Sequence, residues 1–398
     1  MPFLAVAALA IGHLAVFWFE LYKILVFTSL GIFLILAGAE MVRPSNQRRN
    51  WAVFSTFMLI YAYIVLATRW APIPEEALEN AGRTLASALP AYFAGELLAR
   101  RYNLDRILAA SCVMPLIFFP QIIYNIYVYG DPALVGNFSI RTILGVIFAV
   151  VVPMSVGMYF STRKIYYIFT AILFFMAVII IQSRTGILIA PLTSVILIYS
   201  YDKKAARNLL SLGLLPLLFL FSLMNSDLLG RFANVDTDFS VDSNIFAEFS
   251  IDRSLRVDFD RRLHTYMAGK MFTESPIFGD GYSSMLQNNK FDFDIDLTAH
   301  GYPGYLAELG LMGALLFLFF LYYSLRDFVR LSRTRNSGTL AIADKTYLLG
   351  FAAILLAGFF HQQFESAFFG WSAGILSGLA AIPKRKHTAL NADGQMVF

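Results

Sequence analysis

Three short polar motifs contain side chains that could do chemistry at a membrane surface. The first is SRTG at 183–186, which separates two apolar runs. Ser183 suits the N-cap of a following helix, and a helix N-terminus presents free N–H groups and a positive dipole end to an anion. The guanidinium of Arg184 can bind two phosphate oxygens at once. The motif therefore favours a diphosphate site, and an arginine that snorkels to the interface is the simpler alternative.

The second motif lies in a long polar segment, where Arg262, Tyr266 and Lys270 precede SPIFGDGY at 275–282. Their spacing of four residues puts them on one face of a helix, and the proline and glycines that follow predict a turn. The basic face of this helix could lie over lipid headgroups and bind phosphate. A solvated amphipathic helix, with neighbouring aspartates as partners, explains the same pattern.

The third motif is HGYPGYLAELGLMG at 300–313, which leads directly into a long apolar run. Pro303 suits the first turn of a helix, and the positive end of the helix dipole disfavours an imidazolium nearby. His300 should therefore be neutral and able to accept a proton, as a general base must. A histidine without a catalytic role is the alternative. His264, close to Arg262, is a weaker candidate.

The sequence predicts no metal site and no cofactor. Asp292, Asp294 and Asp296 alternate with apolar residues, but an EF-hand loop counted from Asp292 would need glycine where Leu297 stands. The histidines show no metal-ligand spacing. The single cysteine, Cys112, excludes an intramolecular disulfide and a thiolate cluster. The three aspartates are better explained as a solvated acidic strand.

Membrane helices must position these motifs. The chain has 398 residues, of which 58% are hydrophobic and 15% are charged. Soluble domains carry about 25% charged residues, so the composition predicts an all-α integral membrane protein. Its net charge of +4 fits basic cytoplasmic loops and does not require a nucleic-acid partner.

We expect about twelve spans, because runs long enough to cross the hydrocarbon core recur along the chain. The first apolar run is expected to be a retained span and not a signal peptide. Basic residues cluster on alternate loops, which predicts that both termini are cytoplasmic. The expected spans are 3–19, 22–41, 51–68, 83–99, 107–128, 142–160, 165–182, 186–201, 208–224, 304–325, 346–362 and 366–382.

This topology divides the chain into four parts. Helices 1 to 9 occupy 1–224, a large periplasmic loop occupies 225–303, helices 10 to 12 occupy 304–382, and a cytoplasmic tail occupies 383–398. The long loop contains two of the three motifs, so most of the chemistry outside the membrane is expected there.

The three motifs, in this order and on this side, resemble the O-antigen ligase and polymerase family over about 181–320. The resemblance implies a GT-C-like fold in the bacterial inner membrane. It also implies inverting, metal-independent transfer of an undecaprenyl-diphosphate-linked glycan to an acceptor hydroxyl at the periplasmic face. Gly301 follows His300 where the family typically has asparagine.

The resemblance also implies residue roles. Arg184 and Arg262 would bind the diphosphate with Ser183, and His300 would deprotonate the acceptor. His264, Tyr266 and Tyr305 are candidate supporting residues.

Two acceptors are compatible with these roles. A lipid A-core acceptor would make the protein a ligase, and the end of a growing glycan would make it an O-antigen or exopolysaccharide polymerase. A chain-length regulator or a flippase is a candidate protein partner, and membrane lipid surrounds the helices. The alternative from another class is a polysaccharide flippase or secondary transporter, which would be expected to carry ionisable groups deep within its spans.

Overall fold

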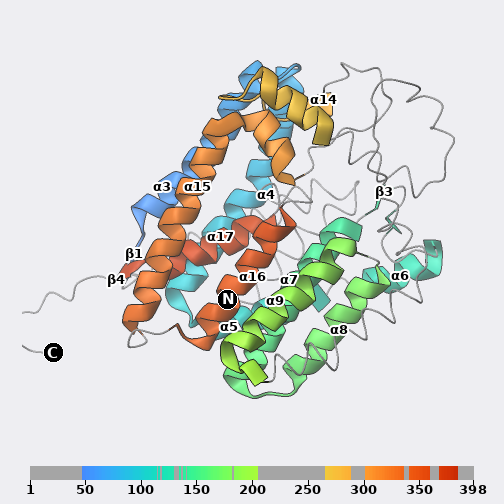
Figure 1. Cartoon of the computed structure of the whole chain (residues 1–398), viewed down its shortest axis with the longest axis vertical. Coiled ribbons are helices and arrows are strands. Elements are labelled where there is room, and N and C mark those ends of the chain that lie inside the picture. The colour runs from blue at the N-terminus through green and yellow to red at the C-terminus, as the bar shows by residue number, and fades with distance from the viewer. Residues whose placement is uncertain are drawn as a thin grey trace, which may run out of the picture.

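The computed structural model shows a helical bundle (Figure 1). Sheet structure in the described part of the chain is confined to two pairs of two-residue strands. The structure describes residues 47–113, 115–116, 119–129, 134–135, 138–139, 141–181, 183–204, 265–287, 301–335, 340–358 and 367–383.

The bounds of the elements are as follows. The helices are α3 (Trp51–Ala67), the 3-10 helix η1 (Thr68–Trp70), α4 (Pro74–Arg101), α5 (Leu104–Val113), α6 (Phe119–Tyr129), α7 (Arg141–Thr162), α8 (Tyr166–Ile180), α9 (Arg184–Tyr201), α14 (Ser284–Gln287), α15 (Gly301–Arg335), α16 (Ile342–Ala357) and α17 (Ala367–Leu379). The strands pair antiparallel, β1 (Gln47–Arg48) with β4 (Ile382–Pro383) and β2 (Leu134–Val135) with β3 (Phe138–Ser139).

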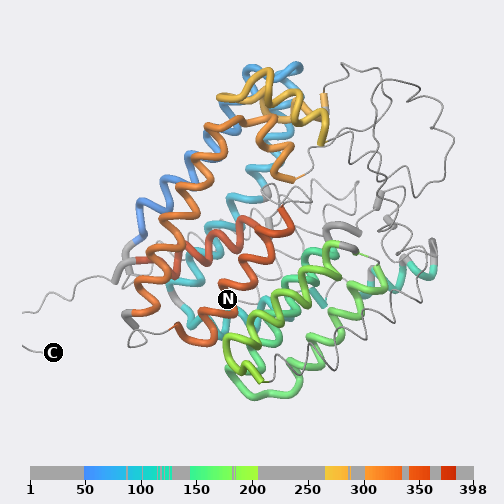
Figure 2. Tube along the Cα trace, viewed as in Figure 1, coloured from blue at the N-terminus to red at the C-terminus, as the bar shows by residue number. Residues whose placement is uncertain are grey.

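Several of these helices suit a membrane. Among the described residues, Trp51–Trp70, Leu144–Thr162 and Gly301–Arg333 are long and apolar enough to cross a bilayer, and Tyr166–Ile180 and Thr185–Tyr201 are shorter apolar helices. The outer faces of α3 and α15 expose large apolar side chains, as a lipid-facing surface does. Figure 2 shows these two helices, far apart in the sequence, running side by side. The expectation of a helical membrane protein is therefore confirmed.

Most expected spans that fall within the described residues correspond to helices, but one prediction is wrong. The expected span 107–128 is two helices, α5 and α6. Pro115 lies two residues after the end of α5, and Pro120 is the second residue of α6. Proline lacks the N–H that helix continuation needs and disfavours helical backbone in the residue before it. The expected spans 3–19, 22–41 and 208–224 lie outside the described residues.

Two other helices are longer than expected. α4 begins at Pro74, before the predicted start near residue 83, because proline fits the first turn of a helix. α15 continues to Arg335 and contains a kink at Gly310, whose backbone is not helical.

The helices α4 and α17 run parallel in close contact. A Cβ added to Gly370 or Gly374 would overlap the carbonyl oxygens of Ala88 and Tyr92, and the four-residue spacing continues to Gly378. Glycines at this spacing let two helix backbones approach closely, as in membrane helix pairs.

The polar contacts gather at the two ends of the bundle, which we call upper and lower as they lie in Figure 1. At the lower end, Asn50 Nδ2 donates to Asp327 at 2.8 Å, and Lys345 Nζ donates to the carbonyl oxygen of Ser200 at 3.4 Å. At the upper end, the N–H of Tyr302 donates to the carbonyl oxygen of Gly358 at 2.9 Å. The side of the membrane that each end faces stays a prediction.

Candidate functional site

The SRTG corner has the predicted cap. Ser183 is the N-cap of α9, with extended backbone, and its hydroxyl accepts the N–H of Gly186 at 3.2 Å. Ser183 is buried, so the cap is shielded from competing solvent. Arg184 is the first residue of α9. The sequence therefore located the N-terminus of this helix correctly.

Close packing explains the glycine of the same motif. A Cβ on Gly186 would lie 2.8 Å from the carbonyl oxygen of Gly145 in α7. A Cβ on Gly145 would overlap the hydroxyl of Ser183. The beginnings of α7 and α9 therefore lie against each other, and the SRTG corner is tightly packed.

The second motif begins with the predicted helix, because residues 265–274 are helical. Met267 and Met271 are buried on one face. Tyr266 is 48% exposed, and Lys270 is also exposed. The helix is amphipathic, and it continues into a turn as the sequence predicts.

The turn is bonded to the kinked part of α15, and we call residues 275–282 together with 307–312 the clasp. The N–H groups of Asp280 and Gly281 donate to the carbonyl oxygens of Ala307 and Glu308 at 2.8 and 3.1 Å. In the opposite direction, two N–H groups of α15 donate to the turn. These bonds run from Leu311 to Pro276 at 2.9 Å and from Met312 to Ile277 at 3.0 Å. The second and third motifs thus form one backbone unit.

Glycine is required at the centre of the clasp. Gly279, Gly281 and Gly310 have φ values of +75°, +103° and +61°. A Cβ on Gly310 would lie 2.5 Å from the carbonyl oxygen of Ile277. The φ of +61° with ψ of −166° at Gly310 is a conformation that essentially only glycine adopts. These glycines are explained by backbone geometry and not by contact with a substrate.

The clasp is anchored to α3. The hydroxyl of Tyr63 donates to the carbonyl oxygen of Phe278 at 2.9 Å and lies 3.2 Å from that of Leu309. One side chain of α3 therefore touches both halves of the clasp.

The clasp is also anchored to α4 and the turn before it. The hydroxyls of Tyr282 and Thr84 lie 2.8 Å apart. Gln287 exchanges two hydrogen bonds with the backbone of Ile73, at 2.9 and 3.0 Å. The buried carboxylate of Glu308 accepts the N–H of Met285 at 3.3 Å. Sequence reasoning missed this set, and the closely spaced glycines of the clasp were its only visible sign.

The start of α15 is fixed on α16. Besides the backbone bond to Gly358, the hydroxyl of Tyr302 donates to the carbonyl oxygen of Leu355 at 2.7 Å. Gly301, with φ of +65°, is the first residue of α15 and directly follows His300 in the sequence. The helix that follows the candidate base is therefore held at both the clasp and the end of α16.

The remaining site predictions are not tested by these contacts. Tyr305 is buried in α15. Arg262, His264 and His300 lie outside the described residues, as do the aspartates at 292, 294 and 296. Across the described ranges, no group of three or more histidine, cysteine or acidic side chains is arranged to hold a metal ion.

The fold is that of a helical membrane protein in which the second and third motifs are bonded to each other. Residues 169–318 match the family model described as O-antigen ligase. The match begins in α8 and ends in α15, so it includes all three motifs. This match confirms the resemblance of the segment to that family. The comparison with curated proteins gives no match.

Proposed function

We propose that the protein is an inverting glycosyltransferase of the O-antigen ligase type. It transfers a glycan from undecaprenyl diphosphate to a hydroxyl of the lipid A-core at the periplasmic face of the inner membrane. The observation that carries this proposal is the family match over 169–318, which contains the three motifs. The clasp supports it, because two of these motifs are bonded to each other there.

In the proposed reaction, Arg184 and Arg262 bind the diphosphate of the donor. The acceptor oxygen attacks the anomeric carbon from the face opposite the diphosphate, and the bond from that carbon to the diphosphate oxygen breaks. The electron pair leaves with the diphosphate, whose developing charge the two guanidinium groups stabilise. His300 takes the proton of the acceptor hydroxyl. This scheme needs no metal, because a diphosphate is already a good leaving group.

The clasp gives these groups a common frame. It directly follows the helix at 265–274, near which Arg262 lies in the sequence, and it contains the kink of the helix that follows His300. Groups that act on one substrate must keep their separation within a fraction of an ångström. Backbone hydrogen bonds between the two segments serve that need better than flexible side chains would.

One observation favours the polymerase alternative. Glu75, Glu76 and Glu79 are exposed at the start of α4, at the end of the bundle that holds the clasp. Negative charge there would repel a phosphorylated lipid A-core more than a neutral glycan end. An assay that offers both acceptors separately distinguishes a ligase from a polymerase.

One observation bears on the transporter alternative. Glu96 lies in the expected span 83–99 and is buried, which sequence reasoning did not recognise as an ionisable group within a span. Its carboxylate pairs with Arg49 at the lower end of the bundle. A transporter would move sugar without making a new glycosidic bond, so product formation in detergent separates the two classes.

The test uses purified protein in detergent with undecaprenyl-diphosphate glycan and each acceptor. Arg184→Lys and Arg262→Lys should each lose at least about tenfold in rate, because a point charge cannot replace a bidentate fork. The matched control is Arg83→Lys, since Arg83 is exposed near the start of α4 and its contacts are with Glu79 and Asn80 of the same helix. Absence of product from wild-type protein, or full activity in both lysine variants, contradicts the proposal.

A further inference from the structure

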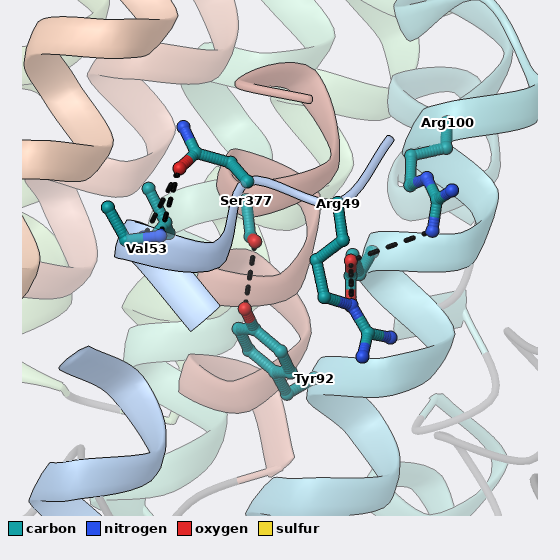
Figure 3. Close-up of polar contacts among 8 residues, drawn as sticks. Arg49, Val53, Tyr92, Arg100 and Ser377 are labelled. Atoms are coloured by element: carbon teal, nitrogen blue, oxygen red, sulfur yellow. Dashed lines mark hydrogen bonds and ion pairs between the residues drawn. The ribbon is translucent and has the colours of Figure 1, made fainter. Parts of the chain in front are cut away.

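A cluster of charged side chains lies where the chain enters α3, and Figure 3 shows it at close range. Arg49 Nε donates to Glu96 Oε1 at 2.7 Å, and Arg100 Nη1 lies 3.8 Å from the same oxygen. The side chain of Glu96 is 1% exposed, so its charge is buried. Two guanidinium groups thus face one carboxylate, and the cluster keeps a net charge of about +1.

Arg49 is held by aromatic rings. Its guanidinium carbon lies 4.4 Å from the ring centroid of Phe54, 5.7 Å from that of Phe93 and 5.8 Å from that of Trp51. Such contacts attract and orient a cation. In Figure 3 the two terminal nitrogens of Arg49 point away from the dashed line that marks its hydrogen bond.

The cluster leaves hydrogen-bonding capacity unused. Among the described residues, the terminal nitrogens of Arg49 have no hydrogen-bond partner, and the side chain is 25% exposed. Over the same part of the chain, the buried Oε2 atom of Glu96 also has no partner. Buried polar atoms normally have partners, so among the described residues this cluster has capacity for another hydrogen-bonding group.

The depth of the cluster matches the headgroup layer of a bilayer. The apolar span of α3 begins at Trp51, two residues after Arg49. Trp51 is 66% exposed, and tryptophan is enriched where hydrocarbon meets headgroups. Arg100 is the second-last residue of α4. Arg49 therefore lies at the end of an apolar span, the level at which a bilayer has its headgroups.

We propose that Arg49, with the added charge of Arg100, binds the phosphate of an anionic phospholipid, with Trp51 against its glycerol and upper acyl region. A guanidinium fork matches two phosphate oxygens. A net charge of about +1 favours a headgroup of charge −1 over a zwitterionic one, whose second group is a cation. The site is separate from the proposed transferase site and does not depend on it.

Such a lipid would tie together distant segments of the chain. Next to Arg49, Asn50 Nδ2 donates to the carbonyl oxygen of Ala380 at 3.2 Å, and β1 pairs with β4. A lipid on Arg49 and Arg100 contacts this junction and α4 at once. Because a ligand that binds only the folded state stabilises it, the bound lipid should raise the melting temperature.

The test is titration of the purified full-length protein, in neutral detergent, with phosphatidylglycerol and separately with phosphatidylcholine. Bound lipid is counted by native mass spectrometry, and the melting temperature is followed in parallel. Wild-type protein should retain phosphatidylglycerol and melt at a higher temperature with it, whereas phosphatidylcholine should have little effect. Equal retention of the two lipids overturns the proposal.

Three variants separate lipid binding from simple structural damage. Arg49→Gln should weaken phosphatidylglycerol binding by about fivefold, the worth of one basic residue near a lipid surface. Glu96→Gln should strengthen it by a similar factor, because it raises the net charge of the cluster to about +2. A purely structural ion pair would not give tighter binding on loss of Glu96. Arg83→Gln, at the opposite end, should bind as wild type does.

If Arg49→Gln fails to fold, phosphatidylglycerol binding by Glu96→Gln still tests the proposal. Unchanged or weaker phosphatidylglycerol binding by folded Glu96→Gln overturns the proposal. Trp51→Leu gives a further measurement, because Trp51 is mostly exposed and its loss should lower lipid retention without unfolding the protein.

Discussion

The two ends of this bundle are held together by different means. The clasp at the upper end is made of backbone hydrogen bonds and of glycines with positive φ values, which residues with a side chain rarely adopt. The lower end is held by the charged side chains of Arg49, Glu96 and Arg100, with aromatic rings around them. A backbone unit has few alternative arrangements, whereas long charged side chains can adjust. This difference fits the two proposed roles. The upper end would hold the reacting groups in place, and the lower end would bind lipid.

The largest effect is expected from breaking the clasp. Gly310→Ala puts a Cβ 2.5 Å from backbone atoms of Ile277 and Gly279 in a conformation that alanine resists. Strain and overlap together should cost roughly 2 to 5 kcal/mol of folding free energy. Chemical denaturation in detergent measures the loss, and transfer activity should fall with it.

Gly82→Ala is the matched control. Gly82 is an exposed residue within α4, and a Cβ there meets nothing within 4 Å. Alanine should stabilise the helix by up to about 1 kcal/mol. If Gly310→Ala were as stable as Gly82→Ala, the clasp would not be the rigid unit described.

A smaller loss is expected at the lower end. Glu96→Ala leaves two guanidinium groups without their carboxylate, and breaking a fully buried pair typically costs 3–5 kcal/mol. Because Arg49 is 25% exposed, water should reduce the loss to about 1 to 3 kcal/mol. The transfer rate per folded molecule should stay unchanged. A fall in the transfer rate per folded molecule would show that the two ends are coupled.

Many local features of this structure can be predicted from the sequence, whereas its long-range contacts cannot. The cap at Ser183, the helix before SPIFGDGY and the turn after it depend on neighbouring residues, so they were predictable. Pro115 and Pro120, which divide 107–128, are local signals of a helix break. The clasp pairs two segments of the chain that are not neighbours, and Arg49, the partner of Glu96, lies 47 residues before it. No local rule specifies such long-range pairing.

A smaller change tests the anchor of the clasp. Tyr63→Phe removes the hydroxyl that reaches the carbonyl oxygens of Phe278 and Leu309. Because the ring remains and only a hydrogen bond is lost, the free energy of unfolding should fall by about 1 to 2 kcal/mol. A fall in the free energy of unfolding of less than about 0.3 kcal/mol would show that the clasp does not need its hydrogen bond to α3.

Cysteine labelling sharpens the comparison by assigning each end to a side of the membrane. Thr273 is exposed near the clasp and Lys203 is exposed at the lower end, while the native Cys112 is buried. In intact cells, Thr273→Cys should react with an impermeant maleimide and Lys203→Cys should not. The reverse pattern would place the clasp in the cytoplasm.

His300→Ala tests the proposed chemistry most directly. The measurement is the transfer rate from undecaprenyl-diphosphate glycan to acceptor in detergent, followed across pH, together with donor binding. If His300 takes the acceptor proton, the rate should fall by about 10²- to 10⁴-fold while donor binding and folding persist. His264→Ala should lose far less. The wild-type rate should fall on acidification, because protonation of His300 removes the base. The residual activity of His300→Ala should not show this fall at acidic pH. Transfer at the wild-type rate in His300→Ala would contradict the account.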